Sequence, residues 1–416
     1  MKTPLKTLLF ATPLFVGGLE LGLRLTGYEF PTLGMPDREL GWSLRPGAKG
    51  LVRQENREGV FVTINNDGLR DREHTIQKPA STLRIAVLGD SLCEATEVRL
   101  EKTFWAIAEQ ELAVCARSRG LKVEFINFGV AGYGTAQELI MLRTRVWKYQ
   151  PDLVLLAFSG SDVSENFRPL SGQPLAPYYI YQGDALVLDD SFRSRVKYEH
   201  LRNLKAFFSQ RLRILQLGEA LVHRTSPQPA PPDYRLYSVP SDPAWEEAWS
   251  VTEKLISMIQ EEASEHGAQL WIATTSNDIQ VHPDPRKREA LAKKLGLSDL
   301  FYPERRIRTM AAQEGIPVIT LAEEMARYAE HNEINLHGFQ PMTGYGHWNE
   351  DGHRVAAQII ASRLCGELGW ASESQRRGSG SSLISTRRCR DGHHPWTFFS
   401  PLVAQDHSCQ GSFSDR

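Results

Sequence analysis

The sequence has little cysteine, and what it has shows no pattern. Its five cysteines in 416 residues are odd in number and widely spaced (Cys93, Cys115, Cys365, Cys389 and Cys409). The sequence therefore predicts neither a disulfide framework nor a metal–thiolate site. It also lacks a Gly-x-Ser-x-Gly pentapeptide, which argues against the nucleophile elbow of α/β-hydrolases. No charge predominates: a formal net charge of −2 gives no reason to expect a nucleic-acid partner.

The N-terminus begins with positive charge and continues as an apolar stretch. Lys2 and Lys6 precede a mainly apolar run from Leu8 to Leu19. This order is typical of an export signal, and we see no convincing cleavage site. We expect residues 1–27 to be a signal peptide or an uncleaved membrane anchor. As an anchor it would be a transmembrane helix, although the apolar stretch is short for a helix that spans a membrane. The alternative is a buried amphipathic helix.

The rest of the chain, 41% hydrophobic residues overall, can bury a substantial core. Residues 28–80 are rich in glycine, proline and charge, with one β-like run from Gly59 to Ile64, and are predicted to be a small β-rich extension. From Leu83 onward, strands alternate with helices, which predicts parallel βαβ units. The predicted strands are Ile85–Leu88, Val123–Phe128, Leu153–Phe158, Gln269–Ala273 and Pro317–Leu321. The predicted helices contain Phe104–Val114 and span about 136–147, 245–266, 305–313 and 352–368.

This alternation predicts an α/β fold class: a doubly wound, three-layer α/β/α parallel sheet over residues 81–370. The period is lost between about 165 and 243, which we interpret as an insertion near the carboxyl edge of the sheet, where substrate loops tend to lie. Residues 371–416 are dominated by serine, glycine and arginine and are predicted to be a disordered tail.

The most informative stretch is LRIAVLGDSLCE, from Leu83 to Glu94. An apolar run typical of a buried strand ends at Gly89, which permits a turn that a side chain would hinder, and Ser91 follows. Ligands bind at the carboxyl ends of strands in open α/β sheets, so Ser91 is a candidate nucleophile. The alternative is an ordinary turn with a helix N-cap, a role that suits both Asp90 and Ser91.

Three further blocks follow in order, and the four together resemble the SGNH (GDSL) hydrolase superfamily. They are Gly89–Leu92 after the first strand, Asn127–Thr135 after the second, Gly160–Asp162 after the third, and His347–His353 before the last helix. The resemblance covers about residues 83–368. Glu20–Tyr28 and Gly68–Arg70 also look like the bacterial branch that is anchored to the membrane by its N-terminus.

The resemblance implies the fold already expected, with a flavodoxin-like sheet, and a role for each matched residue. Ser91 would be the nucleophile and His347 the general base. The oxyanion hole would comprise the Ser91 N–H, the N–H of Gly132 and the side chain of Ser161. Gly129 is a less favoured alternative to Gly132. For the glycines, turn geometry alone is a compatible explanation, and for His347 the alternative is a structural histidine beside a helix.

Asp90 and Asp162 are expected to have supporting roles. Two positions depart from the family pattern. Ser161 stands where the family has asparagine, and no aspartate precedes His347, where Gly344 and Tyr345 are found instead. A Ser–His dyad is feasible without it, and the triad acid stays unassigned; Glu350 and Asp351 follow the histidine and are not assigned.

Other motifs are given weaker interpretations. Asp391–Pro395 matches the family's closing Asp-x-x-His-Pro motif but lies in the aperiodic tail. A metal site at His347, Asp351 and His353 lacks the required helical spacing, and His353 is expected to support the helix start. Ser276–Asp278 is interpreted as a loop. Cys93 is expected to pack in the core.

The sequence thus predicts a serine esterase or acylhydrolase, with no metal or organic cofactor, acting on an acylated small molecule, saccharide or lipid. One alternative is an O-acyltransferase for a cell-surface polysaccharide. A second, of another class, is a non-catalytic carbohydrate-binding or assembly protein on the same fold. We expect an extracytoplasmic location, in the bacterial periplasm or at the cell surface, either membrane-anchored or secreted. The oligomeric state is not predicted.

Overall fold

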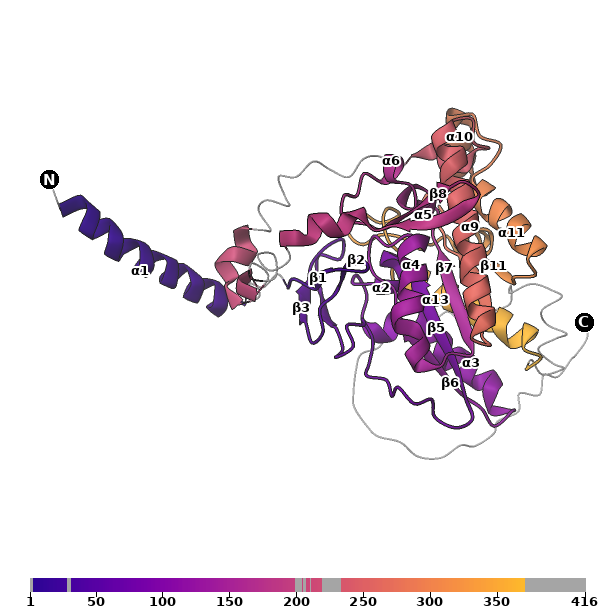
Figure 1. Cartoon of the computed structure of the whole chain (residues 1–416), viewed down its shortest axis with the longest axis horizontal. Helices are drawn as coiled ribbons and strands as arrows, with labels where there is room; N and C mark the ends of the chain where they lie inside the picture. Colours follow the sequence, from indigo (N-terminus) through magenta and orange to yellow (C-terminus); the bar gives the residue numbers. More distant parts are fainter. Residues whose placement is uncertain are drawn as a thin grey trace, which may run out of the picture. The chain divides into compact units, whose positions relative to one another are not determined.

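A five-stranded parallel sheet lies between layers of helices (Figure 1). The computed structural model describes residues 3–27, 31–198, 204, 207–209, 211–218 and 233–370. The strand order across the sheet is β11-β10-β7-β5-β6. In chain order these are β5 (Thr82–Gly89), β6 (Lys122–Asn127), β7 (Leu153–Phe158), β10 (Gln269–Thr274) and β11 (Val318–Thr320). This is the flavodoxin-like order 2-1-3-4-5, so the predicted doubly wound sheet is confirmed.

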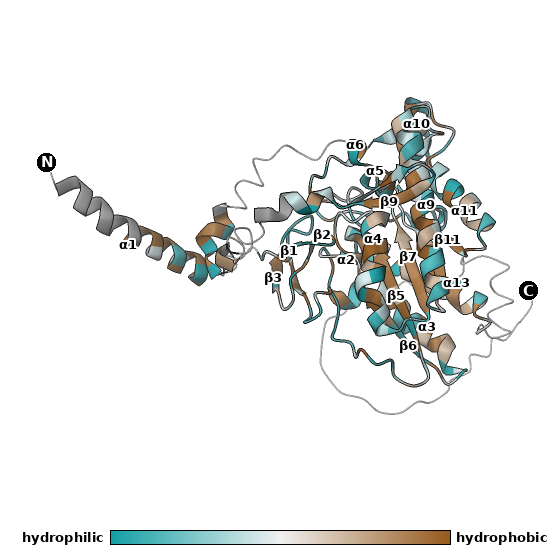
Figure 2. Cartoon of the chain, in the orientation of Figure 1, coloured by the Kyte–Doolittle hydropathy of each residue, from teal (hydrophilic) through white to brown (hydrophobic). Residues whose placement is uncertain are grey.

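Helices cover both faces of the sheet. On one side lie α3 (Phe104–Arg117), α12 (Leu321–Asn332) and α13 (Glu350–Glu367); on the other lie α4 (Thr135–Met141), α9 (Pro243–Glu265) and α11 (Tyr302–Gln313). Successive side chains of β5 point alternately into the two cores: Ile85 and Val87 into the first, Ala86 and Leu88 into the second. Both faces are buried, which explains why the central strands are continuously apolar (Figure 2).

The predicted helices differ from the observed ones mainly at their ends. The helix expected over 136–147 keeps α-helical geometry only to Met141, then continues as a π turn (Leu142–Val146) and a 3₁₀ turn (Trp147–Tyr149). The helix α10 (Pro285–Leu295) and the helix α12 were not predicted as elements. Polar side chains cap the starts of α3, α9 and α13, namely Thr103, Asp242 and Asn349.

The segment before the sheet consists of two antiparallel hairpins. They are formed by β1 (Gly34–Asp37) with β2 (Gly41–Leu44), and by β3 (Lys49–Val52) with β4 (Val60–Thr63). Leu40, Val62 and Ile64 belong to the same buried cluster as the second face of the sheet. These hairpins therefore share a core with the sheet domain, and we refer to residues 34–63 as the hairpin segment.

The region expected to be an insertion contains structure that the sequence did not indicate. After α5 (Ser161–Glu165) and α6 (Arg168–Ser171), strands β8 (Tyr178–Gln182) and β9 (Ala185–Asp189) form a hairpin, followed by 3₁₀ turns at Ser191–Tyr198 and Tyr234–Tyr237. Tyr178 and Tyr179 are buried while the other three residues of β8 are exposed. That pattern is too short to register as strand periodicity.

At the N-terminus, α1 spans Thr3–Leu25. Of the helices in the described part of the chain, none combines the length and apolar character needed to cross a membrane, so the expected transmembrane helix is not found. The predicted tail, residues 371–416, and its Asp391–Pro395 motif lie outside the described residues.

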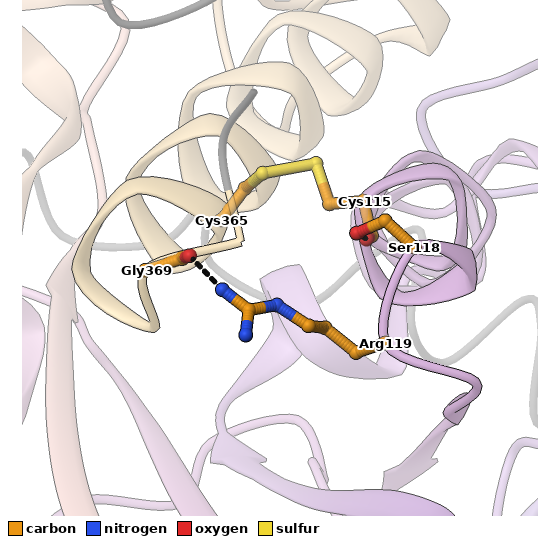
Figure 3. Close-up of a disulfide and its surroundings, with 5 residues drawn as sticks. All are labelled: Cys115, Ser118, Arg119, Cys365 and Gly369. Carbon is orange, nitrogen blue, oxygen red and sulfur yellow. Dashed lines mark hydrogen bonds between the residues drawn. A yellow bond between two sulfur atoms is a disulfide. The ribbon is translucent and has the colours of Figure 1, made fainter. Parts of the chain in front are cut away.

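One disulfide joins two helices of the same layer, although the spacing of the cysteines indicated no disulfide framework. Cys115 on α3 is bonded to Cys365 on α13, with Cα atoms 6.1 Å apart (Figure 3). Nearby, Arg119 donates a hydrogen bond of 2.7 Å to the carbonyl of Gly369. The two cysteines are separated by 250 residues, so only the packing of α3 against α13 reveals the pair. Cys93 is free and buried, as predicted.

We expect the double variant Cys115→Ser/Cys365→Ser to be less stable than the wild-type chain. A crosslink that closes so long a loop restricts the unfolded chain, so its loss should lower the free energy of unfolding by about 2 to 5 kcal/mol. Urea denaturation of both proteins, without reductant, measures the difference. Treating the wild-type chain with reductant should reproduce it, and equal unfolding free energies would show that the crosslink contributes nothing.

Candidate active site

Ser91 lies directly beyond the carboxyl end of β5, at the start of the short helix α2 (Ser91–Glu94). Asp90 caps this turn, because its Oδ1 accepts a hydrogen bond of 2.9 Å from the amide of Leu92. β5 has β6 on one side and β7 on the other, so Ser91 is at the point where the winding of the sheet reverses. In this class of sheet, such a point opens a crevice in which ligands bind.

A side chain at Gly89 would hinder the turn, as expected, and the structure gives the physical reason. Its backbone does not have a positive φ angle, but a Cβ at this position would lie 2.4 Å from Sγ of Cys93 and 3.2 Å from Cβ of Ala157. Close packing of the turn on the neighbouring strand, and not a special backbone conformation, excludes a side chain here.

His347 is brought to Ser91 from the other end of the chain. Its Nε2 lies 2.8 Å from the Ser91 hydroxyl, although 256 residues separate the two. This is a hydrogen-bond distance, which a general base needs to remove the proton from a nucleophile. The structure thus brings together the two residues predicted to be catalytic.

The loop that carries His347 is held by the Ser276–Asp278 segment. The amide of Gly346 donates to Asp278 Oδ2 at 3.0 Å, and the buried Trp348 donates through Nε1 to the Ser276 hydroxyl at 2.9 Å. The residues on both sides of His347 are therefore fixed to the loop after β10. The sequence identified this segment only as a loop, since its partners lie some 70 residues away.

A carboxylate occupies the other side of the His347 ring. Nδ1 of His347 lies 2.7 Å from Oε1 of Glu55, and the His347 amide donates to Oε2 of the same carboxylate at 2.9 Å. Glu55 belongs to the loop between β3 and β4, and no motif around it in the sequence indicates this role. Tyr345, which stands where the family pattern has an aspartate before the histidine, is 62% exposed.

The electrostatics of this contact favour a charged imidazole in the resting site. Burial alone lowers the pKa of His347, but the hydrogen bond to Glu55 and the charges of Glu97, Glu55 and Asp90 outweigh it and raise the pKa to about 9. For Glu55 the effects have the opposite signs. Burial raises its pKa, but the hydrogen bonds and charge of His347 outweigh burial and hold the pKa below its usual range. The two groups form an ion pair near neutral pH.

The loop after β6 supplies one amide suited to an oxyanion. In this loop the amides of Gly129, Val130 and Ala131 donate to the Asn127 side chain, the Gly89 carbonyl and the Glu94 carboxylate. Among the described residues, no acceptor is found for the amides of Gly132 and Ser91. Gly132 also has a φ angle of +76°, which favours glycine. This pattern favours Gly132 over Gly129 as the donor.

Ser161 is the first residue of α5, immediately beyond the end of β7. Its hydroxyl lies 3.0 Å from that of Ser159. The fully buried Asp162 accepts the Ser159 amide at 3.1 Å and so fixes the turn that presents Ser161. Burial, with Glu138 and Asp90 nearby, raises the pKa of Asp162 well above its ordinary value.

His353 packs inside the protein near the start of α13. It is 1% exposed, and its Nδ1 accepts a hydrogen bond of 3.2 Å from the Phe104 amide. Burial lowers its pKa to about 3, so the ring is neutral. Within the described ranges, no group of three or more histidine, cysteine, aspartate or glutamate residues is arranged to hold a metal ion.

No protein-family model matches the chain, and comparison with curated proteins gives no match. Several solved structures are similar. The acetyl xylan esterase AlAXEase is 14% identical, with a TM-score of 0.37, over 68% of this chain and 99% of its own. TesA is 13% identical, with a TM-score of 0.34, over 68% of this chain and 97% of its own.

Axe2, an acetylxylan esterase from Geobacillus stearothermophilus, is 11% identical, with a TM-score of 0.37, over 70% of this chain and 96% of its own. TM-scores and identities this low carry no conclusion about activity. Any assignment of activity therefore rests on the geometry around Ser91 and His347.

We expect the reactivity of Ser91 to rise with pH. The base must be neutral to accept the hydroxyl proton, and His347, with its pKa raised to about 9, is mostly protonated below that pH. The rate at which a fluorophosphonate modifies Ser91 should therefore increase from pH 6 and reach half its maximum near pH 9. A rate that levels off near pH 6.5, the value of an unperturbed imidazole, would contradict this electrostatic account.

Proposed function

We propose that this protein is a serine esterase or acylhydrolase that acts through an acyl-enzyme intermediate on Ser91. The observation that carries the proposal is the 2.8 Å distance between the Ser91 hydroxyl and Nε2 of His347, at the carboxyl edge of the sheet. A hydroxyl hydrogen-bonded to a neutral imidazole can attack a carbonyl carbon as the imidazole takes its proton. A merely structural serine would not require this pairing.

The reaction has two halves. Ser91 Oγ bonds to the ester carbonyl carbon while its proton passes to Nε2 of His347. The resulting tetrahedral intermediate collapses by breaking the bond to the alcohol oxygen, which receives that proton and leaves. Water, deprotonated by His347, then attacks the acyl-Ser91 ester, and the proton returns to Ser91 as the carboxylic acid is released.

The negative oxygen of each tetrahedral intermediate needs donors. The amides of Ser91 and Gly132 are the candidates, and the Ser161 hydroxyl is a third. One such donor typically contributes about 3 to 4 kcal/mol of transition-state stabilisation. The serine at position 161 is shorter than the asparagine expected from the family resemblance, so we propose that the two amides provide most of this stabilisation.

For the substrate, we propose an O-acyl ester of a saccharide or lipid. Support comes from Trp42 on β2, whose indole is half-buried beside the oxyanion loop. A Cβ placed on Gly132 would lie 3.4 Å from the ring carbon Cζ2 of Trp42. The indole Nε1 of Trp42 donates a hydrogen bond of 3.0 Å to the Ala131 carbonyl. An aromatic ring at this position can pack against a sugar ring or an apolar chain.

We also propose an extracytoplasmic location, whether residues 1–27 are cleaved or retained. The order of charge and apolar residues at the N-terminus supports export. The Cys115–Cys365 bond gives independent support, because disulfides persist in oxidising compartments and are rare in the bacterial cytosol.

We expect Ser91→Ala and His347→Ala to abolish ester hydrolysis. Each change should lower kcat for p-nitrophenyl acetate by roughly a thousandfold or more, because removing a member of such a catalytic pair typically has effects of this size or larger. The matched control is Ser118→Ala, because Ser118 is an exposed serine at the end of α3 whose hydroxyl donates to the Cys115 carbonyl. Hydrolysis that survives in folded Ser91→Ala protein would refute the mechanism.

We expect Cys115 and Cys365 to be oxidised only when the chain is exported. In bacteria expressing the full chain, acid quenching followed by maleimide labelling should find these two thiols blocked, and protease added to spheroplasts should digest the protein. In a chain that lacks residues 1–27 and stays in the cytoplasm, both thiols should react. Reduced thiols in the full-length, protease-resistant protein would contradict the proposed location.

A further inference from the structure

The hairpin segment carries a carboxylate into the candidate active site. Glu55 is two-thirds buried and makes two hydrogen bonds to one residue, His347: Oε1 to the ring at 2.7 Å and Oε2 to the backbone amide at 2.9 Å. A bidentate contact of this kind fixes both the ring and the backbone from which the ring projects. Surface ion pairs rarely have such geometry.

The His347 loop is shaped to receive this carboxylate. Gly346 has a φ angle of +91°, and a Cβ there would lie 2.4 Å from Oε2 of Glu55. A side chain at position 346 would therefore displace the carboxylate. On the opposite side, Asn56 donates a hydrogen bond of 3.0 Å to the Glu97 carbonyl, which fastens the β3–β4 loop to the segment after α2.

The rest of the hairpin segment is tied to the oxyanion loop. Trp42 donates to the Ala131 carbonyl at 3.0 Å, and the Tyr133 hydroxyl donates to the Trp42 carbonyl at 2.5 Å. Farther along, Gln137 on α4 donates to the Leu40 carbonyl at 2.7 Å. The hairpin segment is thus anchored to the oxyanion loop and α4, and through Asn56 to the segment after α2, by contacts outside the ion pair.

We propose that Glu55 is the positioning residue of the catalytic group: it orients His347 and stabilises the imidazolium that forms when Ser91 reacts. This inference rests on the proposed esterase function. The active site is then built from three separate parts of the chain, and the hairpin segment is a necessary part of it. Glu55 takes the role that an aspartate has in a Ser-His-Asp triad.

The chemistry follows from the two ring nitrogens. With Nδ1–H donating to Glu55, the lone pair of neutral His347 is on Nε2 and faces the Ser91 hydroxyl. When Nε2 takes the proton, the carboxylate stabilises the positive ring. Other ionisable groups near the ring are Glu97, Asp90, Glu94, His337 and His353. Of these, none is hydrogen-bonded to the ring in the described part of the chain.

The test compares Glu55→Gln, Glu55→Asp and the control Glu58→Gln in the otherwise intact protein. Glu58 is an exposed glutamate of the same loop. We expect Glu55→Gln to lower kcat for p-nitrophenyl acetate by roughly 10²- to 10⁴-fold with little change in KM, since an amide can hold the ring in the wrong tautomer. The pH at half-maximal rate should also fall from near 9. Glu55→Asp should recover part of the rate, and Glu58→Gln should match the wild type.

Two results separate this inference from the function on which it rests. If the wild-type protein hydrolyses no ester and Ser91 resists fluorophosphonate, the proposed function fails. If the wild-type protein is active and Glu55→Gln has the same kcat and pH profile, Glu55 is not a positioning residue while the function stands.

If Glu55→Gln does not fold, nitrogen-15 NMR of the histidines in the wild-type protein tests the proposal instead, because it reports which ring nitrogen of His347 carries the proton. Above pH 9, a His347 ring protonated on Nδ1 supports the proposal, and one protonated on Nε2 overturns it.

Discussion

The imidazole of His347 lies between a hydroxyl and a carboxylate, and the proposed chemistry depends on this placement. On one side is Ser91, 2.8 Å from Nε2; on the other is Glu55, 2.7 Å from Nδ1. Both partners are needed. Without the first there is no nucleophile to activate, and without the second the ring is free to rotate and to take either tautomer.

The fold explains how three distant segments meet at this ring. Parallel strands end at one edge of the sheet, and the order of β6, β5 and β7 places Ser91 where the winding of the sheet reverses, the point at which such sheets bind ligands. His347 is fixed just before α13 by the loop after β10. α13 is in turn crosslinked to α3 through Cys115 and Cys365. Glu55 and His347 lie on loops, and hydrogen bonds from the residues beside them hold these loops to the sheet domain.

Sequence reasoning succeeded where the signal was local. The apolar run before Gly89 predicted β5, and with the regular alternation that follows it predicted the sheet. The position of Ser91 at the sheet edge followed from the strand that precedes it. The roles expected for Gly132 and His347 followed from the resemblance of their blocks to the SGNH superfamily.

Features that depend on a contact between residues far apart in the sequence could not be predicted. Glu55 lies 292 residues before His347, in a stretch rich in charge and without a motif, so nothing near it indicates its partner. The Cys115–Cys365 pair was missed for the same reason. The β8–β9 hairpin was missed because its strands are short and only partly buried. In each case tertiary packing, and not local pattern, determines the structure.

A crystal structure of the protein after reaction with a fluorophosphonate tests the central claim most directly, because the adduct resembles the tetrahedral intermediate. We predict phosphorus bonded to Ser91 Oγ, and its phosphoryl oxygen within about 2.7 to 3.1 Å of the amides of Ser91 and Gly132. The His347 ring should remain bonded to Glu55. An adduct on another residue, or one at Ser91 with His347 turned away from both partners, would contradict the account.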